Sequence, residues 1–243
     1  MSRPRIYFLS GMGSDERLIE PQRALDADVI ALPWIAHEPD DTLGTYAVRL
    51  AKTFDTSKPF YLGGISLGAM LAYEMAADMG PNLRGLILLV GANSYRDIPL
   101  LYRMIGRVVG WLPAFTLRIG KSVVPAVRKL FGISTRQQAR LFQSMLGDAD
   151  VHFLKWSLRA ILHWPGPAKI ADVPMLWIYA QRDLILPRPK HHAGVVVPGA
   201  GHTVNVTHAA EVNAIITAWL AEHAETDRPT YNHSYGQPAT EDR

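Results

Sequence analysis

Short apolar runs alternate with amphipathic stretches along the first part of the chain. Short apolar runs bounded by Gly, Pro or polar residues are typical of buried strands, whereas apolar residues three or four apart are typical of helices. The pattern predicts strands at residues 5–10, 29–32, 60–62 and 83–90, a helix that begins at Glu16, and helices at 42–54 and 67–79. Strands that alternate with helices predict a parallel sheet covered by helices on both faces.

The alternation stops after Gly91 and returns near residue 174. Between residues 98 and 162 the apolar spacing is helical or ambiguous, and no stretch has the pattern of a strand. Further on, the pattern predicts strands at 174–180 and 192–197, and a last helix at 209–223. We therefore expect an α/β fold: a doubly wound, mainly parallel sheet of about six strands with an all-helical insertion.

These patterns divide the chain into three parts. We expect residues 1–93 and 166–223 to form the α/β core and residues 94–165 to form the helical insertion. Residues 224–243 are polar and contain almost no apolar side chains, so we expect this tail to be disordered.

Composition limits the class of protein. The 243 residues are 48% hydrophobic and 19% charged, and they contain no run of eighteen apolar residues. We expect no secretory signal, because the apolar stretch before Ser10 is short. These features predict a soluble protein, with the cytoplasm as the expected location. Because there is no cysteine, disulfides and thiolate metal ligands are excluded.

Charge is distributed unevenly. The net charge is +3, but residues 94–163 hold eleven Lys or Arg against three Asp, a net charge of +8. Arg103 and Arg107 stand four apart, on one face of a predicted helix. A basic insertion could attract an anionic acyl substrate, rest on an anionic membrane surface, or be merely solvated; of the first two we favour substrate attraction. No motif indicates nucleic-acid binding.

Ser66 lies where a predicted strand meets a predicted helix, in the pattern Gly64-x-Ser66-x-Gly68. Glycines on both sides let the strand and helix backbones come close, so that the turn lifts the serine hydroxyl above the sheet. The following helix begins there, and its free N–H groups favour negative charge. A structural turn is the alternative, whereas a phosphate loop needs Lys where the chain has Ala69.

A serine hydroxyl needs a general base and a group that orients the base. Of nine histidines, His202 lies in a glycine-containing loop directly after the last predicted strand, at the sheet edge where ligands gather. Asp183 ends the preceding strand and is the expected orienting acid. Asp97, which follows the fourth strand, is the competing candidate. The chain order Ser66, Asp183, His202 is one of the known orders of a serine triad.

Four motifs resemble those of the α/β-hydrolases: Ser10-Gly11-Met12-Gly13 after the first strand, the Ser66 corner, the acid at Asp183, and the pair Gly201-His202. The resemblance covers residues 6 to about 220. It implies a six-stranded parallel sheet, a cap over the active site, and an oxyanion hole made by the backbone N–H groups of Met12 and Leu67.

These features together predict a serine hydrolase of carboxylic esters or thioesters that acts through Ser66, His202 and Asp183. We expect it to need no cofactor or metal and to take a small-molecule acyl substrate, which can be anionic. Two alternatives stay open: a non-catalytic ligand-binding or interaction protein on the same fold, and a carbon–carbon hydrolase or lyase with the same triad.

Overall fold

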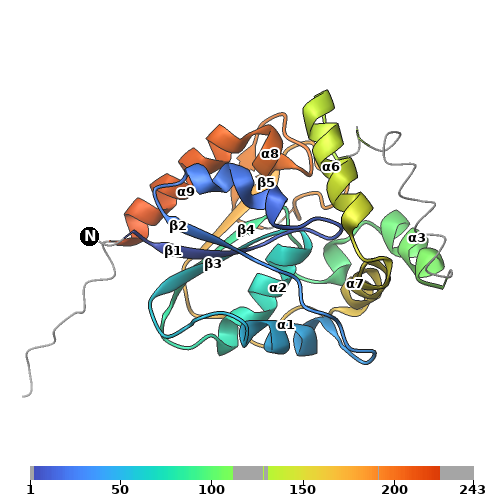
Figure 1. Cartoon of the computed structure of the whole chain (residues 1–243), viewed down its shortest axis with the longest axis horizontal. Coiled ribbons are helices and arrows are strands. Elements are labelled where there is room, and N and C mark those ends of the chain that lie inside the picture. Colours follow the sequence, from blue (N-terminus) through green and yellow to red (C-terminus); the bar gives the residue numbers. More distant parts are fainter. Residues whose placement is uncertain (1–2, 112–127, 129–130, 191, 225–243) are drawn as a thin grey trace, which may run out of the picture.

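A computed structural model describes residues 3–111, 128, 131–190 and 192–224 (Figure 1). The predicted disordered tail, apart from Ala224, lies outside this part of the chain. The elements in chain order are β1 (Arg5–Leu9), η1 (Glu16–Ala24), β2 (Asp28–Leu32), α1 (Leu43–Ala51), β3 (Phe60–Ile65), α2 (Leu67–Met75), η2 (Ala76–Asp78), β4 (Leu83–Leu89), η3 (Tyr95–Asp97), α3 (Leu100–Trp111), α6 (Arg136–Asp148), α7 (Val151–His163), β5 (Met175–Ala180), β6 (Val195–Val197), α8 (Val204–Thr207) and α9 (Ala209–Ala224).

The predicted parallel sheet is confirmed. Its six strands lie in the order β2-β1-β3-β4-β5-β6, and every neighbouring pair is parallel. The chain steps from β1 to β2 at one edge, then crosses back over β1 to β3 and continues toward the other edge. Because all strands run the same way, the loops that follow them meet along one edge of the sheet, where ligands bind in folds of this kind.

Both faces of the sheet are buried, as the continuous apolar runs predict. Along β1, Ile6 and Phe8 pack in a cluster with residues of η1 and α9, whereas Tyr7 and Leu9 pack with residues of α1 and α2. Figure 1 shows the same division, with η1 and α9 on one side of the sheet and α1 and α2 on the other. The predicted helices on both faces are therefore confirmed.

Some predicted boundaries are wrong for local reasons. The segment that begins at Glu16 is a 3₁₀ helix with Pro21 inside it, since proline supplies no N–H for an α-helical hydrogen bond. The helix predicted at 67–79 is divided into α2 and the short η2. The last strand begins only at Val195, because Gly194 has a φ of 150° that a regular strand does not adopt.

In the described part of the stretch between β4 and β5, all regular elements are helices: η3, α3, α6 and α7. This stretch lies beyond one end of the sheet in Figure 1. α3 packs against α7 at Gly106, where a Cβ atom would meet Leu158 and Leu162. The indole N–H of Trp156 on α7 donates to the Asp41 carbonyl at 2.9 Å, and that of Trp164 donates to Glu74 at 2.6 Å. These two bonds join α7 and the residue after it to the α1 and α2 side of the core.

Candidate active site

Ser66 occupies the corner between β3 and α2 in a left-handed backbone conformation, with a φ of 57°. A non-glycine residue adopts this conformation rarely and at a cost of about 1–3 kcal/mol, so the surrounding packing must impose it. Gly64 and Gly68 explain how. A Cβ atom at Gly64 would overlap the backbone of Gly68, and one at Gly68 would overlap the carbonyl groups of Leu9 and Ser10. The predicted reason for both glycines is thus found in the structure.

The structure brings the three predicted side chains together from three separate loops at the carboxyl ends of the strands. His202 Nε2 lies 3.0 Å from Ser66 Oγ, and His202 Nδ1 lies 2.8 Å from Asp183 Oδ2. Ser66 follows β3, Asp183 lies just after β5, and His202 follows β6. Asp183 and His202 are both buried.

Asp183 is held in place by backbone groups as well. Its Oδ1 accepts hydrogen bonds from the backbone N–H of Ile185 at 2.8 Å and of Leu186 at 3.0 Å, which leaves Oδ2 directed at His202. The competing acid, Asp97, accepts instead from the backbone and side-chain amides of Asn93. Of the two acids, therefore, Asp183 is the one placed beside the imidazole.

The loop that carries His202 is fixed by Phe131, a contact that the sequence did not indicate. The backbone carbonyl of Phe131 accepts from the N–H and the hydroxyl of Thr203, and the Phe131 ring meets the imidazole edge to face at 6.0 Å. Gly132 and Gly201 are in backbone contact, and a Cβ atom on either would overlap the other. The Phe-Gly pair inside the helical stretch was visible in the sequence, but its partner lies far along the chain.

A cavity of about 240 Å³ opens beside Ser66 and His202. Apolar side chains make most of its wall, and they come from the first loop, the region after β5, and the helical stretch between β4 and β5. The apolar residues contributed by that stretch are Phe131, Ile133, Phe142, Leu146 and Leu154. Of the aromatic residues in this stretch, Phe131 and Phe142 line this cavity, whereas Phe153, Trp156 and Trp164 are buried and do not line it; Phe115 lies outside the described residues.

The two residues proposed as oxyanion donors, Met12 and Leu67, lie near Ser66 in different segments. Leu67 is the first residue of α2, so its N–H is one of the groups that a helix leaves without an intrahelical acceptor. Met12 follows Gly11 in the loop after β1 and lines the same cavity as Ser66. Among the described residues, no group of three or more His, Asp or Glu side chains is placed to hold a metal ion.

A comparison with known protein families identifies the family of this chain. The model of the Alpha/beta hydrolase family matches residues 6–215. The chain belongs to the alpha/beta hydrolase family. Membership of the family supports a hydrolytic activity.

Solved structures of this fold resemble the chain along nearly its whole length. An esterase from Thermogutta terrifontis superimposes with a TM-score of 0.69 at 19% identity, covering 90% of both chains. MenH from S. aureus gives 0.72 at 19% identity, covering 92% of this chain and 96% of its own. The enol-lactonase from Burkholderia xenovorans LB400 gives 0.67 at 16% identity, covering 91% of this chain and 92% of its own. At these identities the likeness shows the alpha/beta hydrolase fold alone.

One curated protein is similar in sequence to part of this chain. It is named as a subunit of an NADH-quinone oxidoreductase, from Deinococcus deserti, and is 27% identical over 186 residues, which are 67% of this chain. The match spans 46% of that protein's length, so this chain corresponds to less than half of it. In the described part of this alpha/beta hydrolase, no helix is long and apolar enough to cross a membrane.

The close backbone contacts at the serine corner generate a prediction about stability. We expect Gly68→Ala to lower the free energy of unfolding by about 3 kcal/mol, because the new methyl group must displace the Leu9 and Ser10 carbonyls. The matched control is Gly147→Ala on α6, where a Cβ atom meets nothing within 4 Å; there alanine should stabilise by about 0.5 kcal/mol. Urea unfolding of both variants measures the difference, and equal effects would contradict the packing argument.

Proposed function

We infer that this alpha/beta hydrolase is a serine hydrolase that cleaves carboxylic esters or thioesters through an acyl-enzyme on Ser66. The observation that carries the inference is the continuous chain of hydrogen bonds from Ser66 Oγ through the His202 ring to the Asp183 carboxylate. Each group has the chemistry that its place requires: a nucleophile, a base and an acceptor that orients the base.

The proton transfers follow from this geometry. An ionised Asp183 carboxylate only accepts, so His202 carries its proton on Nδ1 and leaves Nε2 to accept the hydroxyl proton of Ser66. The Ser66 oxygen then attacks the substrate carbonyl, and the imidazolium returns the proton to the leaving alcohol or thiol. Water, deprotonated by the same imidazole, attacks the acyl carbonyl and releases the acid from Ser66.

Negative charge that develops on the carbonyl oxygen needs donors beside Ser66. We assign this role to the backbone N–H groups of Met12 and Leu67, which belong to the two segments that flank the serine. Leu67 also places the positive end of the α2 dipole at this point. Each donor of an oxyanion hole typically lowers the barrier by about 2.7–4 kcal/mol.

The size and lining of the cavity indicate the acyl group. Its volume of about 240 Å³ lies below the range of about 300–1,000 Å³ that is usual for small-molecule pockets. Apolar residues of the helical stretch form much of the wall, so this stretch acts as a cap that excludes water from the acyl-enzyme. Short, apolar acyl groups are therefore the expected substrates.

The first test separates an enzyme from a non-catalytic ligand-binding protein. We expect a fluorophosphonate probe to label the wild-type protein at Ser66, because His202 activates that hydroxyl. Ser66→Ala should abolish labelling and His202→Ala should nearly abolish it. Gel fluorescence measures labelling, and p-nitrophenyl butyrate should be hydrolysed much faster than p-nitrophenyl palmitate.

His208→Ala is the control for this test, since His208 lies six residues beyond His202 and its ring faces Thr207 rather than Ser66. This variant should be labelled like the wild type. A folded wild-type protein that takes up no probe and cleaves neither ester would favour the ligand-binding alternative.

The second test concerns the acid. We expect Asp183→Asn to keep the fold and to lower kcat by about 10⁴-fold, as is typical when the aspartate of a triad becomes asparagine. The side-chain amide in that variant would stabilise the wrong tautomer of His202. Asp97→Asn should stay close to the wild-type rate, because its partner is Asn93. A larger loss in the Asp97 variant would overturn the assignment.

One observation favours a second role, for α3. Its large apolar side chains Leu100, Leu101, Met104, Ile105 and Val108 are between 48 and 64% exposed. They form one continuous stripe at helical spacing, opposite the face that packs on α7, and no described residue of α3 lines the cavity at Ser66. α3 has no acidic residue and carries Arg103 and Arg107. Such a helix is suited to lie on an anionic membrane surface, whereas attraction of an anionic substrate remains a prediction.

Co-sedimentation with vesicles tests this role. We expect wild-type protein to bind phosphatidylglycerol-containing vesicles more than pure phosphatidylcholine vesicles, and the double change Leu101→Ser with Ile105→Ser to remove most of the binding. Val48→Ser with Ile170→Ser is the matched control, since both side chains are comparably exposed outside α3. No binding by the wild type, or equal losses in both double variants, would contradict the role.

A further inference from the structure

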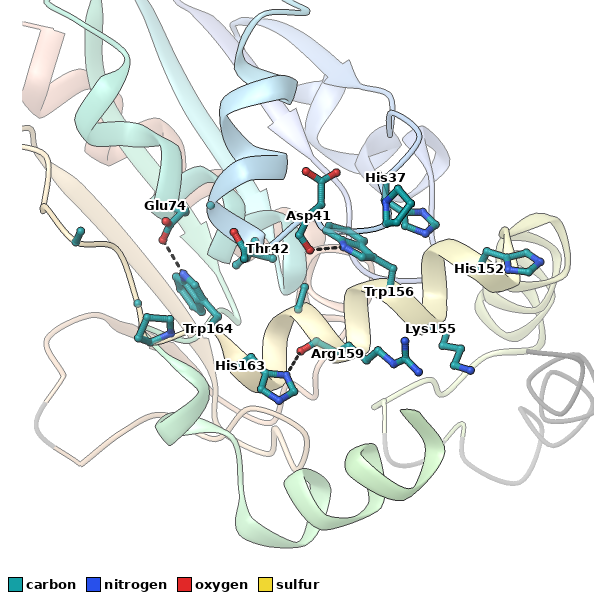
Figure 2. A pocket seen from close by; sticks show the side chains of 17 residues that line it. His37, Asp41, Thr42, Glu74, His152, Lys155, Trp156, Arg159, His163 and Trp164 are labelled. Atoms are coloured by element: carbon teal, nitrogen blue, oxygen red, sulfur yellow. Dashed lines mark hydrogen bonds between the residues drawn. The ribbon is translucent and has the colours of Figure 1, made fainter. Parts of the chain in front are cut away.

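A second and larger cavity lies on the other side of α7 from the site at Ser66. It is a cleft of about 990 Å³ between α7, the start of α1 and the side of α2 (Figure 2). It shares no lining residue with the cavity at Ser66. Leu154 on α7 lines the first cavity, whereas the next two residues, Lys155 and Trp156, line the cleft. The proposed hydrolase mechanism uses none of the cleft residues.

One wall of the cleft is basic. His152, Lys155, Arg159 and His163 occur along α7 at spacings of three or four residues, so they follow one stripe of the helix about 16 Å long. α7 contains no Asp or Glu between Val151 and His163. Figure 2 shows Lys155 and His152 toward one end of α7 and Glu74 with Trp164 toward the other. The positive charge is therefore concentrated at one end.

Two acids line the cleft, and neither lies against Lys155. The Asp41 carboxylate is buried and lies 2.6 Å from the Arg49 guanidinium, which comes from outside the cleft. Burial raises the pKa of Asp41, but the Glu38 N–H and Arg49 together hold it below its usual value, so the pair stays charged and mutually neutralised. Glu74 accepts from the neutral Trp164 indole, which leaves its charge in place, but it lies toward the other end of α7 from Lys155 (Figure 2). The negative charge of the cleft is therefore separated from its basic end.

The remaining surface of the cleft is mainly apolar. His37 stacks on Trp156 with 5.5 Å between ring centroids, which gives an aromatic wall beside the basic stripe. Pro39, Ala160 and Pro165 add partly or fully exposed apolar groups. A cavity of this size, with an apolar surface and a few charged groups at one end, has the usual character of a ligand site.

We propose that this cleft binds a small organic anion, a carboxylate, phosphate or sulfonate with an apolar or aromatic body. The anionic head lies at Lys155 and Arg159, and the body lies along the apolar surface toward Trp164. Arg159 supplies a planar fork that matches an oxyanion, and Lys155 supplies a point charge on a flexible stem. A neutral molecule of the same shape gains only the apolar contacts.

A pair of fluorescent probes tests the proposal. 8-Anilinonaphthalene-1-sulfonate carries the anionic head, and N-phenyl-1-naphthylamine has the same rings without it. With Ser66→Ala protein, so that catalysis plays no part, we expect the sulfonate to bind at least tenfold more tightly than the neutral amine. Lys155→Glu with Arg159→Glu should weaken sulfonate binding at least tenfold, and added salt should narrow the difference between the probes.

Arg136→Glu with Arg140→Glu is the matched control, because these exposed residues also stand four apart, on α6, and line neither cavity. It should leave sulfonate binding nearly unchanged, as should Leu101→Ser with Ile105→Ser, which removes exposed apolar surface on α3. Lys155→Gln with Arg159→Gln, a milder change, should give an intermediate loss. Equal losses in the α6 and α7 variants, or equal affinity for both probes, would overturn the proposal, and either result leaves the hydrolase assignment to its own tests.

Discussion

The close approach of three backbones at the Ser66 corner is the constraint on which the rest of the site depends. Gly64 and Gly68 allow β3, α2 and the end of β1 to meet without side chains between them, and this contact holds Ser66 in a conformation that serine rarely adopts. This strain costs about 1–3 kcal/mol, and the favourable free energy of burying the sheet must offset it. The strained conformation places the hydroxyl at the sheet edge, where α2 begins.

The parallel sheet brings two further residues, Asp183 and His202, to the corner that carries Ser66. Because β3, β5 and β6 run in the same direction, the residues after them gather at one edge, although Ser66 is more than a hundred positions away from Asp183 and His202 in the chain. Asp183 is locked by two backbone N–H groups, and the His202 loop is fixed by the Phe131 carbonyl. The helical stretch therefore does more than cover the site, since it also orients the loop that carries the imidazole.

The sequence predicted what depends on local pattern. The six parallel strands, the glycine corner and the placement of Ser66, Asp183 and His202 at carboxyl ends of strands follow from apolar runs and glycine spacing within short windows. Contacts between residues that are distant in the chain could not be predicted in this way, because they leave no pattern within a short window of sequence. The Gly132 and Gly201 contact and the bond from Trp156 to Asp41 depend on how α7 and the core come together, which periodicity does not encode. The 3₁₀ form of η1 was indicated by Pro21, which the apolar pattern alone does not take into account.

The structure distinguishes basic residues of the helical stretch that the sequence alone does not distinguish. In the sequence, Arg103 and Arg107 appear equivalent to Lys155 and Arg159, since each pair stands four apart on a helix. In the structure the first pair belongs to a helix with an exposed apolar stripe, and the second lines a cleft in which Asp41 is paired with Arg49 and Glu74 lies toward the far end (Figure 2). Two pairs of basic residues with the same spacing thus have different surroundings: the pair on α3 lies on a helix with an exposed apolar stripe, and the pair on α7 lies in the wall of a cavity. α7 separates the two cavities with adjacent residues, so a ligand at Lys155 lies against the same helix turn whose Leu154 closes the space beside Ser66.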